Sequence, residues 1–121
     1  ALEAGIRSMD DIEFSPDGEL YILGTNTHKV RKITKDGKIV TVAGKGYGGF
    51  FGDGGPATKA MLKNPAAITF DSKGNMFIAD MGNNRIRKVD QKGSITTLAG
   101  TGAFGWGRTG ETVEIYLQNF P

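Results

Sequence analysis

An internal repeat with a period of 56 residues constrains this chain more than any other feature of its sequence. Shifting the chain by this period, without a gap, superimposes identical residues: Ile12 on Ile68, Phe14 on Phe70, Gly18 on Gly74, Ile22 on Ile78, Arg31-Lys32 on Arg87-Lys88, Gly37 on Gly93, Ile39 on Ile95, Thr41 on Thr97, and Ala43-Gly44 on Ala99-Gly100. A fixed period is the signature of repeat architectures, whose units bury their apolar faces against their neighbours. We therefore expect two copies of one structural unit.

Each copy contains four short segments that are rich in Ile, Val, Thr and Phe, the residues that favour strands. They cover residues 11–14, 19–23, 29–33 and 38–43 in the first copy, and residues 66–70, 75–79, 85–89 and 94–99 in the second. Asp17-Gly18 and Asp36-Gly37 predict two-residue hairpin turns, because both residues of such a turn need a positive φ. The second copy keeps the glycines as Gly74 and Gly93.

The apolar residues of these strands do not keep to one face. Val30 and Ile33 lie three positions apart, as do Ile86 and Val89, so each pair points to opposite sides of its strand. A sheet that is apolar on both faces needs a neighbour on each side, which radially stacked four-stranded sheets provide. The sequence predicts an all-β fold, with two four-stranded antiparallel β-propeller blades at about residues 9–64 and 65–121.

Two blades do not close a ring, so they leave sheet faces and edges open. We expect the chain to be part of a larger propeller, completed by other blades of the same propeller or by other copies of the chain. The 121 residues carry 15 basic and 13 acidic side chains, a balance that names no partner, and no cysteine. No apolar run approaches the roughly 20 residues that a membrane-spanning helix requires.

The longer connections should gather on one side of the sheets, because strand ends alternate between two sides in an antiparallel sheet. These connections cover residues 24–28, 44–64, 80–84 and 100–120, and we call their side the long-loop face. Binding residues concentrate on long loops held by a rigid scaffold, so we expect any site there. Within the connection, residues 54–62 predict one or two helical turns, with Pro56 at the first helical position and Asp53 as the cap.

Two motifs make the chain resemble the NHL repeat family. One is Asn83-Asn84-Arg85-Ile86-Arg87-Lys88-Val89 after Ile78-Ala79-Asp80, and the other is Gly52-Asp53-Gly54-Gly55-Pro56-Ala57 before Leu62-Lys63-Asn64-Pro65. The resemblance implies a propeller of about six blades that serves as a binding platform for proteins, RNA or small ligands. Relatives with this glycine-rich connection are bacterial and often extracytoplasmic, which implies the periplasm or cell surface. A minority are enzymes, such as the peptide-amidating lyase, whose histidine ligands do not carry over to the single His28.

Nine residues are candidates for ligand binding. They are Tyr47, Phe50, Phe51, Phe104 and Trp106 in the long connections, and Asp80, Asn83, Asn84 and Arg85 in the turn between two strands. Exposed aromatic residues anchor partners or stack on sugars, and the alternative is that they fill the space between blades. For the polar group, the alternative is an Asp80–Arg85 pair across the turn, with the asparagines hydrogen-bonded to their own backbone.

Other patterns carry no site. Gly44-x-Gly46-x-x-Gly49 and its copy at Gly100 resemble a dinucleotide fingerprint but lack the helix that must follow it at once. We predict no cofactor, no metal and no catalytic residues, and nucleic acid is disfavoured because acids interrupt the basic strands. The sequence favours a non-catalytic scaffold that binds a protein or a small or carbohydrate ligand. The alternative is part of a propeller hydrolase or lyase whose catalytic residues lie in blades absent from this chain.

Overall fold

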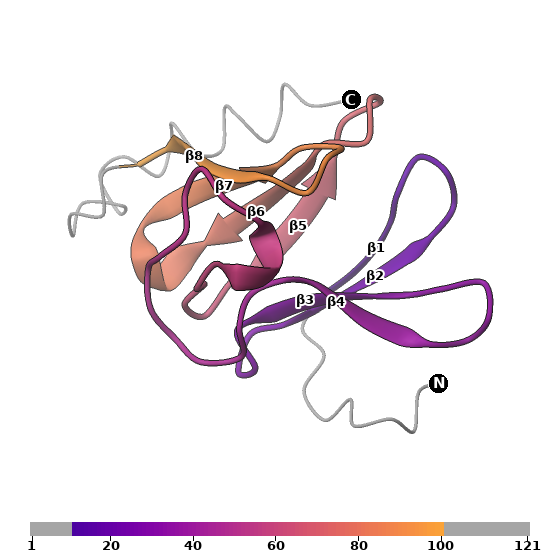
Figure 1. Ribbon diagram of the computed structural model, residues 1–121, viewed down its shortest axis with the longest axis horizontal. Helices are drawn as coiled ribbons and strands as arrows, with labels where there is room; N and C mark the ends of the chain where they lie inside the picture. Colours follow the sequence, from indigo (N-terminus) through magenta and orange to yellow (C-terminus); the bar gives the residue numbers. More distant parts are fainter. Residues whose placement is uncertain (1–10, 101–121) are drawn as a thin grey trace.

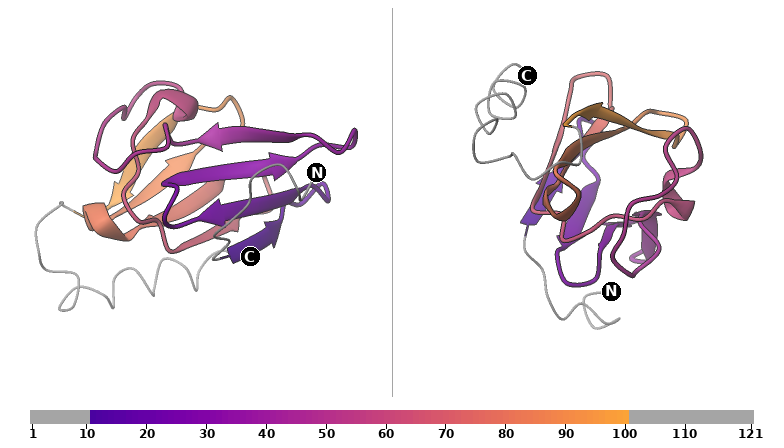
Figure 2. Two further views of the ribbon diagram at one scale, coloured as in Figure 1. Left: turned by 90° about the horizontal axis from the view of Figure 1, so that it is seen from below. Right: turned by 90° about the vertical axis from the view of Figure 1, so that its left-hand side faces the viewer.

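Two four-stranded antiparallel sheets form the part of the chain that the computed structural model describes, residues 11–100 (Figures 1 and 2). The first sheet comprises β1 (Asp11–Phe14), β2 (Leu20–Gly24), β3 (Lys29–Ile33) and β4 (Ile39–Ala43), in that order. The second comprises β5 (Ala67–Phe70), β6 (Met76–Asp80), β7 (Arg85–Val89) and β8 (Ile95–Ala99). Two single turns of 3₁₀ helix, η1 (Ala57–Lys59) and η2 (Met81–Asn83), lie in the connections. All eight predicted strands are confirmed, with ends within one residue of the prediction.

The main core lies between the two sheets and includes the long connection. Its buried members come from the first sheet, from the connection and from the second sheet: Leu23, Val30, Ala43, Ala57, Ala60, Leu62, Ile68, Phe70, Met76, Ile78, Val89 and Ile95. Tyr21 meets Phe70 edge-on across the two sheets, with ring centroids 4.7 Å apart. All five residues of β6 are buried, and Ala79 and Ile86 form a second buried cluster. The second sheet is therefore apolar on both faces, as predicted.

The short turns differ from the prediction. In each of the four, a side-chain oxygen at the start of the turn accepts a hydrogen bond from the backbone N–H four residues later, from Ser15 to Glu19, Thr34 to Lys38, Asp71 to Asn75 and Asp90 to Ser94. Only the glycines have positive φ, between 82° and 88°, at Gly18, Gly37, Gly74 and Gly93. These are three-residue loops that end in a left-handed glycine, so the two-residue prediction was wrong. The acceptor side chain stabilises the wider turn.

The pKa of the Asp71 carboxyl should lie below 3.8, the ordinary value of an aspartate. Burial opposes its ionisation, but hydrogen bonds from the Asn75 side chain and from the backbone of Asn75 and Lys73 outweigh burial and lower its pKa. A lowered folded-state pKa means that this carboxylate stabilises the turn above about pH 4, and that the contribution is lost as the pH falls through the lowered value. A ¹³C NMR titration of the Asp71 carboxyl measures this midpoint, and a midpoint at or above 3.8 contradicts the expectation.

The connection between β4 and β5 follows the outer edge of β8. Gly54 donates to the carbonyl of Ile95 at 2.7 Å, the N–H of Ile95 donates to Gly55 at 3.0 Å, and Ala57 donates to Gly93 at 2.8 Å. Residues 54–57 therefore add a short paired segment to an edge that would otherwise be open. We call these residues the edge segment.

The predicted helical turns in this connection are only partly present. The helical part is the single turn η1, and Pro56 precedes it instead of occupying its first position. No side chain caps η1, so the prediction that Asp53 caps it was wrong. Gly54, Gly55 and Ala57 form backbone hydrogen bonds with β8, and Pro56 is extended at φ −64° and ψ 135°, which leaves only residues 57–59 for the helical turn.

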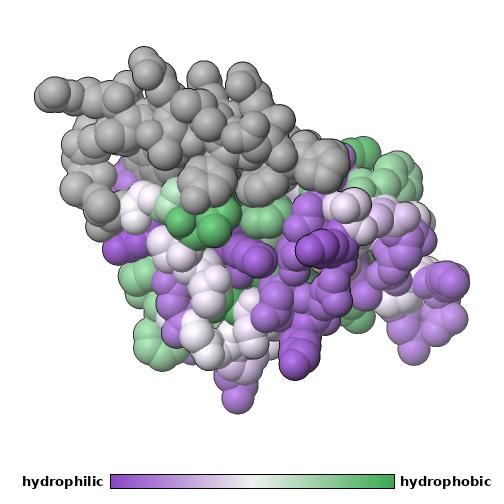
Figure 3. Space-filling model, turned by 90° about the horizontal axis from the view of Figure 1, so that it is seen from above, coloured by the Kyte–Doolittle hydropathy of each residue, from purple (hydrophilic) through white to green (hydrophobic). Residues whose placement is uncertain are grey.

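The surface of the molecule is not uniformly polar. Figure 3 shows hydrophobic residues (green) that interrupt the hydrophilic surface (purple) on the face it views. Large exposed hydrophobic residues include Ile12 and Phe14 on β1 and Val40 on β4. The first sheet therefore exposes Ile12 and Phe14, whose counterparts Ile68 and Phe70 are buried in the second sheet.

Candidate functional site

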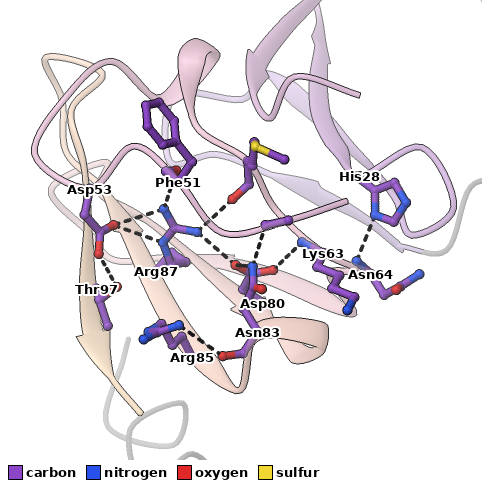
Figure 4. Close-up of polar contacts among 12 residues, drawn as sticks. His28, Phe51, Asp53, Lys63, Asn64, Asp80, Asn83, Arg85, Arg87 and Thr97 are labelled. Carbon is purple, nitrogen blue, oxygen red and sulfur yellow. Dashed lines mark hydrogen bonds and ion pairs between the residues drawn. The ribbon is translucent and has the colours of Figure 1, made fainter. Parts of the chain in front are cut away.

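A buried ion-pair network connects the second sheet to the long connection (Figure 4). Arg87 on β7 and Asp80 at the end of β6 both have fully buried side chains, and Arg87 Nη1 lies 2.9 Å from Asp80 Oδ2. Arg87 also pairs with Asp53 of the connection, with Nη2 and Nε at 3.0 and 3.1 Å from Oδ1. Its remaining donors reach the carbonyls of Met61 at 3.1 Å and Phe51 at 3.3 Å. A charge this deeply buried is tolerated because its donors have acceptors.

Asp80 holds two other segments besides Arg87. Its Oδ1 accepts the backbone N–H of Lys63 at 2.8 Å, and its Oδ2 accepts the Asn83 side-chain amide at 2.8 Å. The same amide group donates to the carbonyl of Gly49 at 2.8 Å. Asp80 and Asn83 thus fasten both ends of the connection to the turn between β6 and β7, and their polar atoms are occupied by the protein itself.

The structure corrects the pairing expected for this turn. The sequence predicted a pair between Asp80 and Arg85, but Asp80 forms its ion pair with Arg87, two positions further along β7. The guanidinium of Arg85 instead lies over the ring of Phe50, 3.8 Å from its centroid, and Nη1 donates to the carbonyl of Asn83 at 3.5 Å. Side chains two positions apart on a strand share a face, so Arg85 and Arg87 lie on the same face of β7. The sequence therefore offered Arg87 as a second possible partner of Asp80, and the shorter spacing across the turn favoured Arg85 instead.

The asparagines of this turn have different roles. Asn83 is buried and binds outside its own turn, as described above. Asn84 ends η2 in the left-handed conformation, at φ 53°, and its N–H donates to Met81 at 3.0 Å. Asparagine tolerates this conformation better than most residues. Asn84 thus serves the turn through its backbone conformation, whereas the side chain of Asn83 bonds Gly49 in the connection.

Three of the predicted aromatic residues lie on the surface of the connection. Tyr47, Phe50 and Phe51 are 58%, 43% and 57% exposed. Phe104 and Trp106 lie outside the described residues. These three side chains are therefore exposed on the surface and do not fill the space between the blades.

Cationic side chains lie against two of these rings, Phe50 and Phe51. Besides Arg85, the guanidinium carbon of Arg87 also lies near the Phe50 ring, 4.8 Å from its centroid. Lys45 Nζ lies 5.4 Å from the centroid of Phe51. Figure 4 shows the Phe51 ring pointing away from the buried network while its carbonyl faces Arg87. We call Lys45, Tyr47, Phe50, Phe51 and Arg85 the aromatic loop surface.

The single histidine has a structural contact. His28 Nδ1 accepts the backbone N–H of Asn64 at 3.0 Å, so it joins the β2–β3 turn to the end of the connection. Within residues 11–100, His, Asp and Glu side chains form no group of three or more that could hold a metal ion. In the same residues, no helix is long and apolar enough to cross a membrane.

Consecutive four-stranded antiparallel sheets, packed face to face and joined by a long connection, define this chain as a pair of β-propeller blades. The family model described as "Teneurin NHL domain" matches residues 49–109. The chain belongs to this family of NHL domains. It is 34% identical to mouse (Mus musculus) teneurin-3 over 97 residues, which cover 69% of this chain and 4% of that protein.

Solved structures from Bacteroides thetaiotaomicron share the fold. A structural genomics protein of unknown function is 29% identical with a TM-score of 0.65, over 74% of this chain and 23% of that one. A protein described as an auxiliary nutrient binding protein is 24% identical with a TM-score of 0.58, over 74% of this chain and 25% of that one. The chain spans about a quarter of each of these structures, and a far smaller part of teneurin-3.

Proposed function

We propose that this chain is part of a propeller that acts as a non-catalytic recognition scaffold, with the ligand held at the aromatic loop surface. The observation that carries the proposal is the exposure of Tyr47, Phe50 and Phe51 on a connection that the buried Arg87 network anchors. Binding residues on a loop fixed by its scaffold lose little conformational freedom when they bind. Asp80 and Asn83, predicted as ligand contacts, serve in this proposal to position the loop.

The surroundings of the rings favour a particular ligand chemistry. Aromatic faces stack on sugar rings and anchor apolar side chains, and the cations of Lys45 and Arg85 add attraction for a carboxylate. A carbohydrate with acidic groups, or a protein segment that mixes apolar and acidic residues, satisfies both requirements. The structures that are less than 25% identical contribute the fold alone, so the proposal rests on this surface.

We also propose a bacterial periplasmic or cell-surface location, with other blades as the immediate neighbours.

Replacing Tyr47 and Phe51 together with Ala should weaken ligand binding about tenfold or more, because exposed aromatic anchors supply most of the energy at such surfaces. Both side chains are more than half exposed, so the free energy of unfolding should stay within about 0.5 kcal/mol of the unchanged chain. The measurement is binding to an array of neutral and uronic-acid oligosaccharides, followed by titration of each glycan that binds.

Phe14→Ala is the matched control for this experiment. Phe14 is 64% exposed, but it lies on β1, away from the connection. Its replacement removes an equally exposed ring and should leave glycan binding unchanged. If the Tyr47/Phe51 variant binds every glycan as the unchanged chain does, or if no glycan binds and an acidic-apolar peptide library gives the same null result, this surface is not the site.

The alternative of a propeller hydrolase or lyase stays a prediction about blades that this chain does not contain. Several histidines or carboxylates facing the channel in those blades would favour it. None of the contacts described above carries it, so we do not propose it.

A further inference from the structure

The space between the two sheets closes unevenly. Near the β2–β3 turn, the paired residues Leu23 and Val30 have no exposed surface. At the opposite end, Phe70, Met76 and Val89 lie in register across the second sheet and keep 4–7% of their surface exposed. This is the end that carries the β1–β2, β3–β4 and β5–β6 turns, on the right-hand side of Figure 1. A groove therefore remains open between the sheets at the short turns.

The outer half of this groove, toward β4 and β8, has an apolar floor. It has a volume of about 460 Å³, within the range of about 300–1,000 Å³ that is usual for small-molecule sites. Tyr21 and Val42 line it from the first sheet, and Phe70, Met76 and Val89 from the second. The hydroxyl of the half-buried Tyr21 makes no hydrogen bond within residues 11–100, so it is available to a ligand. We call this half the interblade pocket.

Charges of both signs line the same pocket. Asp90 and Lys92 come from the β7–β8 turn, and Lys32 comes from β3. Asp90 Oδ1 accepts the N–H groups of Lys92 and Ser94 at 2.9 and 3.0 Å, whereas its Oδ2 has no hydrogen bond within residues 11–100. Lys32 is paired with Glu19 at 3.1 Å, but the Lys92 ammonium has no ion pair or hydrogen bond in the described part of the chain. The pocket thus offers one carboxylate oxygen and one ammonium beside an apolar floor.

We propose that the interblade pocket binds a free α-amino acid with an apolar side chain. Asp90 accepts hydrogen bonds from the ammonium of the ligand, Lys92 binds its carboxylate, and its side chain packs on the floor beside Tyr21. A ligand with a single charge pairs with only one of the two protein groups and meets a like charge at the other. The pocket shares no residue with the aromatic loop surface, so this binding is separate from the function proposed above.

The amino acid L-phenylalanine and two singly charged analogues supply a direct test. The analogue 3-phenylpropanoate lacks the ammonium and 2-phenylethylamine lacks the carboxylate, while both keep the ring. We expect L-phenylalanine to bind about tenfold more tightly than either analogue, because each analogue loses one charge-assisted hydrogen bond. The measurement is an NMR titration of the chain, in which the methyl signals of Val42 and Val89 report binding in the pocket.

Asp90→Asn should lower the affinity for L-phenylalanine to about that of 3-phenylpropanoate. The asparagine oxygen still accepts the backbone N–H groups of the turn, so the change removes mainly the charge. Asp71→Asn is the matched control, because Asp71 accepts the equivalent N–H groups of Lys73 and Asn75 in the β5–β6 turn but does not line this pocket. It should leave the binding of L-phenylalanine unchanged.

Lys92→Met should weaken the binding of L-phenylalanine and 3-phenylpropanoate about three- to fivefold and leave that of 2-phenylethylamine unchanged. The effect is modest because Lys92 is exposed. Lys35→Met removes the same charge from an exposed position in the β3–β4 turn, outside the pocket, and should change none of the three affinities.

Three results would each overturn the proposal: an analogue that binds as tightly as L-phenylalanine, equal affinities of the Asp90 and Asp71 variants, or no shift of Val42 and Val89 with any of the three compounds. The Tyr47/Phe51 variant should bind L-phenylalanine as the unchanged chain does. Failure at the aromatic loop surface and failure at the interblade pocket are therefore distinguishable.

Discussion

Replacing Asp80 with Asn should lower the free energy of unfolding by about 3 kcal/mol or more. Arg87 remains fully buried in this variant, and removing one partner of a buried ion pair costs about 3–5 kcal/mol because the other charge loses its compensation. The asparagine oxygen can still accept from Lys63, but its amide turns N–H donors towards Arg87 and Asn83, which are themselves donors. The measurement is urea denaturation followed by circular dichroism.

Asp53→Asn is the matched control, because Asp53 contacts the same guanidinium from a side chain that is 32% exposed. Water compensates a partly exposed pair, so the loss should be about 1 kcal/mol. If the Asp80 variant does not fold at all while the Asp53 variant does, the Asp80 change again has the larger effect on stability. Equal losses for the two variants would show that Asp80 does not carry the buried charge of Arg87.

The network also determines where the aromatic loop surface sits. Arg87 binds the carbonyls of Phe51 and Met61, and Asn83 binds the carbonyl of Gly49, so three points of the connection are fixed by side chains of the β6–β7 region. Loss of Asp80 should therefore disturb the surface as well as the fold. A ligand-binding defect in an Asp80 variant is consequently no sign of direct contact, whereas Tyr47 and Phe51 test contact alone.

The strands could be predicted almost completely from the sequence because the repeat supplies two independent copies of each element. Propensity alone is ambiguous over five residues, but two copies in one register constrain the ends of each strand. The turn type was missed because it depends on Ser15 and Asp71 accepting a hydrogen bond from the backbone four residues later. A glycine after an acid suggested two-residue turns, while the deciding residue stood earlier in the chain.

The candidate site was less predictable, for a different physical reason. Asp53 and Arg87 are 34 positions apart in sequence, and their contact depends on the path of the whole connection along β8. Local sequence patterns suggest nearby partners only. They therefore predicted Asp53 as the cap of a helix and Arg85 as the ion-pair partner of Asp80. The exposed aromatic residues were found because they lie in the long glycine-rich connections, which the repeat separates from the strands. Their exposure, however, required the folded connection.

Replacing Gly44 or Gly100 with Ala should lower the free energy of unfolding by about 3 kcal/mol or more. Both glycines directly follow the last strand of their sheet and have positive φ, 91° and 94°. A Cβ at Gly44 would lie 2.2 Å from the carbonyl oxygen of His28, and one at Gly100 would lie 2.3 Å from that of Asn84. The colliding atoms are backbone, so no side chain can move aside. The strand must therefore shift away from the turn.

Gly18→Ala isolates the collision from the strain of the backbone conformation. Gly18 has nearly the same φ, 88°, but a Cβ there meets no atom within 4 Å. This control should cost only about 1 kcal/mol, the conformational penalty of a left-handed residue. Thermal and urea denaturation of the three variants give the comparison. If Gly44→Ala costs no more than Gly18→Ala, then β4 does not pack against the β2–β3 turn as closely as the structure shows. Similar large losses at Gly44 and Gly100 would instead establish that both blades close this side by the same backbone contact, and that glycine is required at these two positions for its lack of a side chain.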